Sequence, residues 1–299
     1  MELRQLEIFR ILAHELNFTR TAKQAHCVQS NVSVQIRAME QELGVQLFER
    51  LGQQVRLTPH GSRLLSYADR ILRLVEEAEA TTRHGSSPAG ALTVGSPESV
   101  LTYRLPPVIR AFGTQYPKVK LIFRSVSSSE LMPRLEHGEF DIGLFIDDAW
   151  KNPKLVVEPL CPEPVALVVQ PGHVLLRRAG VCATDLGGET FLLTDSGCAY
   201  RSKLERTLSR SNVRPKAIME FSSVETIKQC AALGMGIACL PKIVVDEELA
   251  SGALQQLSWT GLDLTMKSLV AWHQDKWLSP AMQAFLSTLR LQLSAQETS

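Results

Sequence analysis

Residues 17–56, NFTRTAKQAHCVQSNVSVQIRAMEQELGVQLFERLGQQVR, decide the fold of the first part of this 299-residue chain. Their hydrophobic period predicts a short helix over residues 19–25 and a longer one from about 29 to 43, with Gly44 as its stop signal. The connection at residues 26–28 is so short that the two helices must cross steeply. The apolar stripe expected to be buried in the longer helix comprises Val28, Val32, Ile36, Met39 and Leu43.

The opposite face of the longer predicted helix carries amide, hydroxyl and guanidinium groups, which suit the base edges and phosphates of duplex DNA. After it, residues 51–57 are expected to form a small hairpin around Gly52-Gln53-Gln54, flanked by Arg50 and Arg56. A helix-turn-helix followed by a basic hairpin is the pattern of a winged helix-turn-helix. The alternative is an ordinary helical hairpin, because amphipathic helices with polar outer faces are common.

The sequence resembles the N-terminal domain of LysR-type transcriptional regulators over about residues 2–85. The segments that carry this resemblance are FTRTAKQAHCVQSNVSVQIRAMEQELGVQLFER and the following LTPHG. The resemblance implies sequence-specific binding to double-stranded promoter DNA as a homodimer or homotetramer, with RNA polymerase as a further candidate partner. Ser30 and Val34 depart from the family, which usually has Pro at the first position and often a polar or basic residue at the second. The predicted base or groove contacts are Gln29, Ser30 and Ser33, the predicted phosphate contacts are Gln35, Arg37, Arg50 and Arg56, and Thr19 and Val34 complete the DNA-binding set.

Residues 58–61, TPHG, predict the N-cap and first turn of a further helix that runs to about Arg83. Its apolar positions stand in near-heptad register: Leu64, Leu65, Ala68, Ile71, Leu72, Val75 and Ala78. Such a seam can pair with the same helix of a second subunit or pack back onto its own chain. The resemblance favours pairing. So does the formal net charge of +1, because so few positive charges would give one copy only weak affinity for DNA.

The N-terminal residues MELRQLEIFRILAHEL mix acidic and basic side chains, unlike a signal or transit peptide. They predict a scaffold helix over residues 3–15 that buries Leu3, Leu6, Phe9, Ile11, Leu12 and Leu16. No apolar run approaches the roughly 20 residues that span a bilayer, so we expect a cytoplasmic protein without a membrane partner. The six cysteines have no paired spacing and the seven histidines form no ligand cluster, so neither a metal nor a cofactor is expected.

From Ala91 on, short apolar strands alternate with helices, which predicts an α/β domain built on parallel sheets. Two such units, joined by crossing segments at 160–169 and 264–271, resemble the effector domain of the same family, which shares its architecture with periplasmic solute-binding proteins. The predicted organisation is a winged helix-turn-helix (1–58), a dimerising linker helix (59–84), a hinge (85–90) and an effector-binding domain (91–299). Its subdomain I comprises residues 91–161 and 270–299, and subdomain II residues 162–269. The last helix is expected to return to subdomain I.

A ligand site is expected where the strands of these sheets end, because helix N-termini converge there. Hydroxyl groups with few acidic neighbours at four such ends favour a small anion, most often a carboxylate. Any single serine there can equally be an ordinary helix cap, and Arg201 can either balance an anion or merely cover the surface. The predicted effector-binding residues are Ser96, Glu98, Ser99, Ser127, Ser128, Thr194, Ser196, Cys198, Arg201, Ser222, Ser223 and His273, with Trp272 as a further candidate wall.

Cys198 lies where peroxide-sensing members of the family carry a reactive cysteine, and a helix N-terminus lowers the pKa of a thiol. A redox switch also needs a resolving partner, and the next cysteine, Cys230, is a helix away, so we favour a role without redox chemistry. The leading prediction is a transcription regulator that responds to a small-molecule effector. A solute-binding protein is suggested by the second half alone. An enzyme with Cys198 or a serine as nucleophile and His273 as base lacks any nucleophile elbow or triad spacing, so no catalytic residue is predicted.

Overall fold

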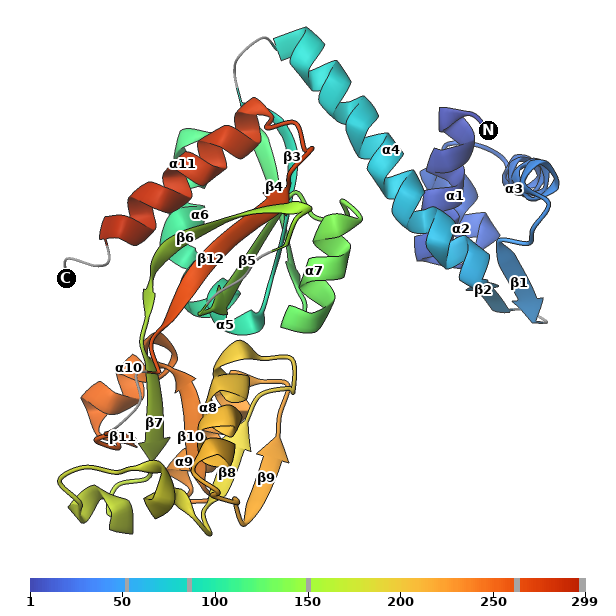
Figure 1. Ribbon diagram of the computed structural model, residues 1–299. Coiled ribbons are helices and arrows are strands. Elements are labelled where there is room, and N and C mark those ends of the chain that lie inside the picture. The colour runs from blue at the N-terminus through green and yellow to red at the C-terminus, as the bar shows by residue number, and fades with distance from the viewer. Residues whose placement is uncertain (52–53, 85–87, 149–151, 261–263, 296–299) are drawn as a thin grey trace. The chain divides into compact units, whose positions relative to one another are not determined.

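The computed structural model describes residues 1–51, 54–84, 88–148, 152–260 and 264–295, except for the side chains of residues 50, 51, 73, 76, 77, 79–84, 294 and 295. The chain divides into two compact units, residues 1–90 and residues 91–299 (Figure 1). Residues 85–87 of the predicted hinge lie outside the described part.

Three short helices open the first unit: α1 (Leu3–Glu15), α2 (Phe18–Gln24) and α3 (Gln29–Leu43). The Asn17 side chain caps α2 by accepting hydrogen bonds from the backbone N–H groups of Thr19 and Arg20, both at 3.0 Å. Gly44 ends α3 in the left-handed conformation, with φ of 68°, which a residue with a side chain rarely adopts. The predicted long helix and its glycine stop are therefore confirmed, and α2 begins one residue earlier than predicted.

The core of the first unit is built from the inner faces of these helices, and the predicted stripe of α3 holds at Val32, Ile36 and Met39, which are buried. It is wrong at the two ends, because Val28 is 68% exposed and Leu43 is 40% exposed. Periodicity assigns a face along the whole helix, but the ends reach past the neighbouring helices. The same reason leaves two predicted core residues of α1, Leu3 and Leu16, exposed. Ile8, which was not predicted, is buried.

The wing is an antiparallel hairpin of β1 (Phe48–Leu51) and β2 (Gln54–Leu57), in which Phe48 lies opposite Leu57. The hairpin begins at Phe48 and not at residue 51 as predicted, because Phe48 pairs with Leu57 and also packs in the core. Its ring centroid lies 5.5 Å from that of Phe9 on α1. Residues 52 and 53 of the predicted tip lie outside the described part, and Gln54, its third residue, begins β2.

Helix α4 (Pro59–His84) begins at the predicted cap, since the Thr58 hydroxyl accepts a hydrogen bond from the Gly61 N–H group at 3.0 Å. Ala68 and Leu72 are buried in the same core as α1 to α3, so this face of α4 packs on its own chain. A second apolar strip is exposed, with Tyr67 at 52% and Leu74 at 55%. Five residues of the predicted seam, Leu64, Leu65, Ala68, Ile71 and Leu72, therefore pack on their own chain, and Tyr67 and Leu74 of the exposed strip were not part of that seam.

The first sheet of the second unit has the strand order β4-β3-β5-β12-β6 (Figure 1). Its strands are β3 (Gly90–Ser96), β4 (Val119–Ser125), β5 (Ile142–Asp147), β6 (Leu155–Glu163) and β12 (Met266–His273). β3 and β5 are parallel, but β12 runs antiparallel to both β5 and β6, so the predicted parallel sheet is mixed. The last helix, α11 (Pro280–Ala295), packs on α6 (Pro106–Gln115) and β6, which confirms its predicted return to this sheet.

The second sheet has the order β11-β7-β10-β8-β9 and is also mixed. Its strands are β7 (Val165–Val169), β8 (Thr190–Leu193), β9 (Ala217–Glu220), β10 (Ile237–Pro241) and β11 (Gln255–Gln256). The remaining helices of the unit are α5 (Glu98–Tyr103), α7 (Ser128–Glu136), α8 (Ala199–Arg210), α9 (Val224–Ala232) and α10 (Lys242–Ser251), with 3-10 turns at Val174–Arg177 and Ala183–Leu186. Helices α5 and α10 were not predicted from the sequence.

The chain crosses between the two sheets at Pro164 and again between β11 and β12. The predicted subdomain limits at 161/162 and 269/270 therefore fall inside β6 and β12. A buried ion pair lies at this crossing. The Arg104 guanidinium at the end of α5 donates to both carboxylate oxygens of Glu163, at 2.8 and 2.9 Å. The Ser268 hydroxyl of β12 donates to the same carboxylate at 2.8 Å, so α5 is tied to both crossing strands.

Candidate functional sites

The outward face of α3 offers polar side chains to solvent, as the sequence predicted. Gln29, Ser30, Val34 and Arg37 are exposed, while Ser33 and Gln35 are half-buried. The two predicted contacts outside α3 that the structure describes, Thr19 and Arg56, are also exposed. The side chain of Arg50 lies outside the described part.

The one acidic side chain between residues 29 and 40 is turned away from this face. The Glu40 carboxylate accepts hydrogen bonds from the backbone N–H groups of Leu47 at 2.8 Å and Phe48 at 3.3 Å, and so fixes the start of the wing. Asn31 is exposed and receives a hydrogen bond from the Gln35 amide at 3.4 Å. It was not predicted, although its four-residue spacing from Gln35 could have identified it as part of the same face.

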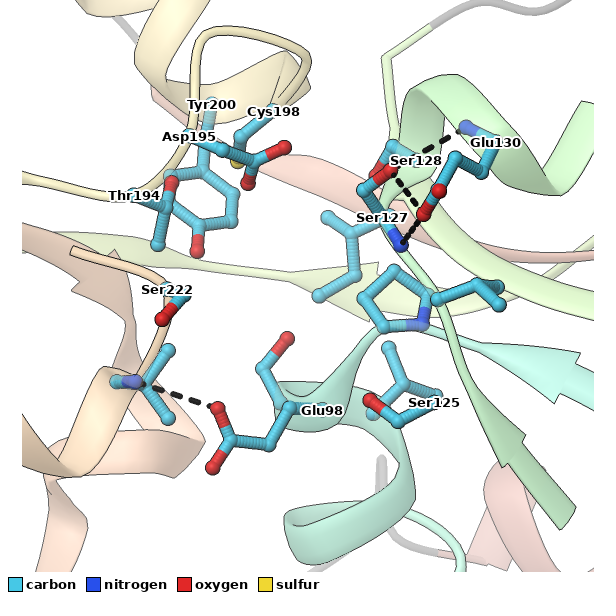
Figure 2. A pocket seen from close by; sticks show the side chains of 16 residues that line it. Glu98, Ser125, Ser127, Ser128, Glu130, Thr194, Asp195, Cys198, Tyr200 and Ser222 are labelled. Carbon is cyan, nitrogen blue, oxygen red and sulfur yellow. Dashed lines mark hydrogen bonds between the residues drawn. The ribbon is translucent and has the colours of Figure 1, made fainter. Parts of the chain in front are cut away.

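The second unit contains a cavity of about 320 Å³ between its two sheets. One wall follows β3, β4 and β5 and comprises Pro97, Glu98, Ser99, Val100, Ser125, Val126, Ser127, Ser128, Glu130 and Ile146. The other follows β8 and β9 and comprises Thr194, Asp195, Cys198, Tyr200, Ser222 and Val224. Figure 2 shows the polar members of both walls around one space. Strand ends from both sheets thus converge, as expected for an open α/β fold.

Seven of the predicted effector-binding residues line this cavity: Glu98, Ser99, Ser127, Ser128, Thr194, Cys198 and Ser222. The other five, Ser96, Ser196, Arg201, Ser223 and His273, are not among its lining residues. Trp272 is buried in the core of the unit. Ser125 and Asp195 lie at the predicted strand ends but were not chosen as effector-binding residues, and the sequence did not indicate Glu130 or Tyr200. Glu130 could have been found, because Ser127 and Glu130 have the spacing of a capping box.

Arg201 is held by its own subdomain. Its guanidinium donates to the carboxylates of Glu205 at 2.8 Å and Glu220 at 2.6 Å, and also to the Thr194 carbonyl oxygen. It therefore covers and braces β8 and β9. His273 ends β12, where its Nδ1 accepts a hydrogen bond from the Asp275 N–H group at 3.2 Å.

The cavity is acidic. The premise that its hydroxyl groups have few acidic neighbours, from which an anionic ligand was expected, is therefore wrong. Glu98, Glu130 and Asp195 line it, and its lining contains no Lys, Arg or His among the described residues. Glu130 accepts hydrogen bonds from the Ser127 hydroxyl at 2.9 Å and the Ser127 N–H group at 3.2 Å, and these bonds lower the pKa of its carboxyl group. Glu98 accepts a long hydrogen bond of 3.4 Å from the Val224 N–H group, which opens α9. Figure 2 shows both sets of bonds.

Thr194, Cys198 and Tyr200 are buried members of the lining. Thr194 is only 7% exposed, and its hydroxyl lies near the Cys198 thiol and the Tyr200 hydroxyl without a hydrogen bond of normal geometry. Burial raises the pKa of the Cys198 thiol, and nearby N–H groups of α8 offset this only in part. The expectation that the helix N-terminus lowers this thiol pKa is therefore wrong, because desolvation outweighs it.

No three His, Cys, Asp or Glu side chains of the described residues are grouped as a metal site would require. Of the helices that the structure describes, none combines the length and the apolar character needed to cross a membrane.

The fold and these two surfaces define a helix-turn-helix regulator with a ligand-binding domain. The chain belongs to the LysR family: residues 3–62 match the family "Bacterial regulatory helix-turn-helix protein, lysR family", and residues 85–294 match the "LysR substrate binding domain". The predicted family, fold class and function as a LysR-type transcriptional regulator are thereby confirmed.

Similar proteins cover nearly the whole chain. It is 40% identical to YwqM of Bacillus subtilis (strain 168), an uncharacterized HTH-type transcriptional regulator, over 97% of this chain and 99% of that protein. A full-length OxyR variant from Pseudomonas aeruginosa is similar in structure, with a TM-score of 0.74, 26% identity, and 97% and 95% of the two chains covered. Full-length CbnR complexed with its target DNA shares the fold, with a TM-score of 0.69, 21% identity, and 98% and 100% coverage.

Proposed function

We propose that this regulator binds double-stranded DNA through α3 and the wing, and that a small organic effector bound in the cavity of residues 91–299 controls this binding. The observation that carries the proposal is the cavity itself. Its volume of about 320 Å³ lies near the lower end of the range for small-molecule sites, roughly 300–1,000 Å³. The buried Thr194 hydroxyl supports the assignment, because a bound ligand would supply the hydrogen bond that it lacks.

The α3 face suits the major groove of DNA. Gln29 and Ser30 are exposed on the first turn, where a recognition helix contacts base edges, and Ser33 follows one turn later. The exposed methyl groups of Val34, at 60%, offer an apolar contact to a thymine methyl group. Arg37 is exposed further along α3 and suits a phosphate oxygen. We assign Gln35, Arg50 and Arg56 to phosphates as well, and Thr19 to the same surface.

A homodimer or homotetramer is the proposed binding form. Tyr67, Leu74 and Ala78 are exposed on α4 at spacings of seven and four residues, which fits the heptad period of a coiled-coil seam. This strip is separate from Ala68 and Leu72, which pack inside the first unit. Two copies would bring two recognition helices to successive major grooves and double the small positive charge of one chain.

We propose further that the protein acts by binding and not by catalysis, and that it acts in the cytoplasm, where its DNA is found. No histidine or lysine is part of the described lining, so the base that most often activates a serine or cysteine nucleophile is missing there. Burial raises the pKa of the Cys198 thiol, so little of it would be the reactive thiolate at neutral pH.

A mobility-shift titration with the DNA that flanks its own coding region tests the proposed function. The full chain is titrated at about 50 and 200 mM salt, alone and with a panel of small amines, alcohols and carboxylates. We expect Ser33→Ala to weaken specific binding by roughly tenfold, the effect of losing one base contact. Arg37→Ala should weaken binding to all sequences and reduce the salt dependence by about one ion.

Arg110→Ala is the matched control, since Arg110 is exposed on α6 in the other unit. It should bind DNA as the unaltered protein does. Ser33→Ala and Arg37→Ala proteins that shift the DNA as well as this control would remove α3 as the DNA-binding surface. A DNA affinity that no small molecule in the panel alters would count against the effector cavity.

A further inference from the structure

We propose that the effector carries a cationic nitrogen group, such as an ammonium, which binds to the Asp195 carboxylate beside the Thr194 hydroxyl, while Glu98 adds negative charge elsewhere in the same lining. The inference rests on the proposed function of the cavity and specifies the chemical class of its ligand. It is opposite in sign to the anion expected from the sequence.

The charges around the cavity favour a cation. Three carboxylates line it, and no basic side chain of the described residues does. The buried basic residues on the helices that begin at its wall, Arg201 and Lys228, are already paired. Arg201 binds Glu205 and Glu220, and Lys228 binds two carboxylates of its own surroundings at 2.9 and 2.8 Å. An anion entering the cavity would therefore meet like charge without a compensating side chain.

Helix N-termini attract anions, but those of α7 and α9 at this cavity already face acceptors of the protein itself. At α7, the Ser127 hydroxyl and the Glu130 carboxylate form a capping box. At α9, Glu98 accepts the Val224 N–H group. At α8, the buried Cys198 is the N-cap residue, and its side chain makes no cap hydrogen bond. A ligand carboxylate at α7 or α9 would have to displace these acceptors, whereas a cation would leave them in place.

Two carboxylates and one hydroxyl remain poorly satisfied. Among the described residues, the half-buried Asp195 side chain has no hydrogen-bond or ion-pair partner, and Glu98 has only its 3.4 Å bond. The Thr194 hydroxyl is buried without a partner. Burying the Thr194 hydroxyl without a partner costs free energy, and an ammonium has donors for this hydroxyl and for the neighbouring Asp195 carboxylate. Figure 2 shows Asp195 next to Thr194, and Glu98 near Ser222, in the lining of the same space.

The apolar part of the lining indicates the character of the rest of the ligand. Val126, Ile146 and Val224 present apolar surface, and the Tyr200 ring lies beside Thr194 (Figure 2). The ligand is therefore amphipathic, with a compact apolar body and the cationic group at one end. Such a molecule fills a mostly apolar cavity while its few polar contacts fix its orientation.

Benzylamine, benzyl alcohol and benzoate form a test series of one size and three charges. Their dissociation constants for the full chain are measured by NMR titration at neutral pH. We expect benzylamine to bind at least about tenfold more tightly than benzoate, since one charge-assisted hydrogen bond changes affinity by about that factor. Asp195→Asn should weaken benzylamine binding by roughly tenfold, Glu98→Gln should weaken it by less, and both should leave benzyl alcohol nearly unchanged. Glu247→Gln is the control, because Glu247 is exposed on α10 and does not line the cavity.

The possible outcomes distinguish failure of the cationic-ligand proposal from failure of the effector-cavity proposal. Tighter binding of benzoate than of benzylamine, at a site that Thr194→Trp blocks, overturns the cationic ligand and leaves the effector cavity standing. Benzylamine affinity that neither Asp195→Asn nor Glu98→Gln changes also overturns the cationic ligand. Binding of none of the three probes, or binding that Thr194→Trp leaves intact, overturns both proposals.

Discussion

Among the individual ion pairs of the second unit, the one between Arg104 and Glu163 is predicted to contribute most to the stability of that unit. The Glu163 side chain is 0% exposed and that of Arg104 is 11% exposed. Glu163→Gln removes the counter-charge and replaces one acceptor oxygen by an NH2 group that faces the guanidinium. Breaking a buried pair in this way costs about 3–5 kcal/mol of unfolding free energy. We expect a cost near the lower end of this range, about 3 kcal/mol, because Arg104 keeps slight contact with solvent.

Urea unfolding followed by tryptophan fluorescence measures this cost in the second unit alone. All four tryptophans of the sequence follow residue 91: Trp150, Trp259, Trp272 and Trp277. Glu158→Gln is the matched control, because it breaks the exposed Arg290–Glu158 pair, whose N–O distance is 2.7 Å, and should cost less than about 1 kcal/mol. Replacing both partners, by Arg104→Met with Glu163→Leu, should recover most of the loss. Equal costs for Glu163→Gln and Glu158→Gln would refute the reasoning.

Three further predictions concern single side chains. Because burial raises the pKa of the Cys198 thiol, a thiol reagent should modify the exposed Cys182 at least about tenfold faster than Cys198 in the folded protein; similar rates, read by mass spectrometry, would contradict this. Asn17→Ala removes both cap bonds of α2 and should destabilise that helix by about 1 kcal/mol, seen as faster hydrogen exchange of its amides, whereas Asn17→Asp should keep protection near the unaltered level. The pKa of Glu130 is lowered in the fold, so its contribution to stability is present above the unfolded pKa, about 4.3, and is lost as pH falls through the lower folded value. The urea midpoint of the second unit should therefore fall between about pH 5 and pH 3, less steeply in Glu130→Gln, and identical slopes would rule this out.

The sequence predicted those features that neighbouring residues determine together. The period of α3, its glycine stop and the Thr58 cap of α4 are all local signals, and all three agree with the structure. The strand ends of the second unit were also predictable, because a strand followed by a serine and a helix has a recognisable pattern. Seven predicted side chains consequently line one cavity.

The features that were missed depend on contacts between distant residues. Val28 and Leu43 continue the apolar period of α3, but nothing covers the ends of the helix among the described residues. Arg201 of α8 forms an ion pair with Glu220 of β9, and no spacing along the chain indicates this contact. The acidic character of the cavity was missed for the same reason, because its three carboxylates come from three separate segments of the chain. Sequence patterns therefore located the cavity but not its charge.

The central claim is that the polar face of α3 recognises the sequence of DNA. Selection of binding sites from a random DNA library measures this directly, using the unaltered full chain, Gln29→Ala, and Gln41→Ala as a control from the exposed last turn of the same helix. We predict that the unaltered protein and Gln41→Ala enrich one common motif, and that Gln29→Ala loses the base preference at one position of that motif. Enrichment of no motif by the unaltered protein, or of an unchanged motif by Gln29→Ala, would contradict the claim.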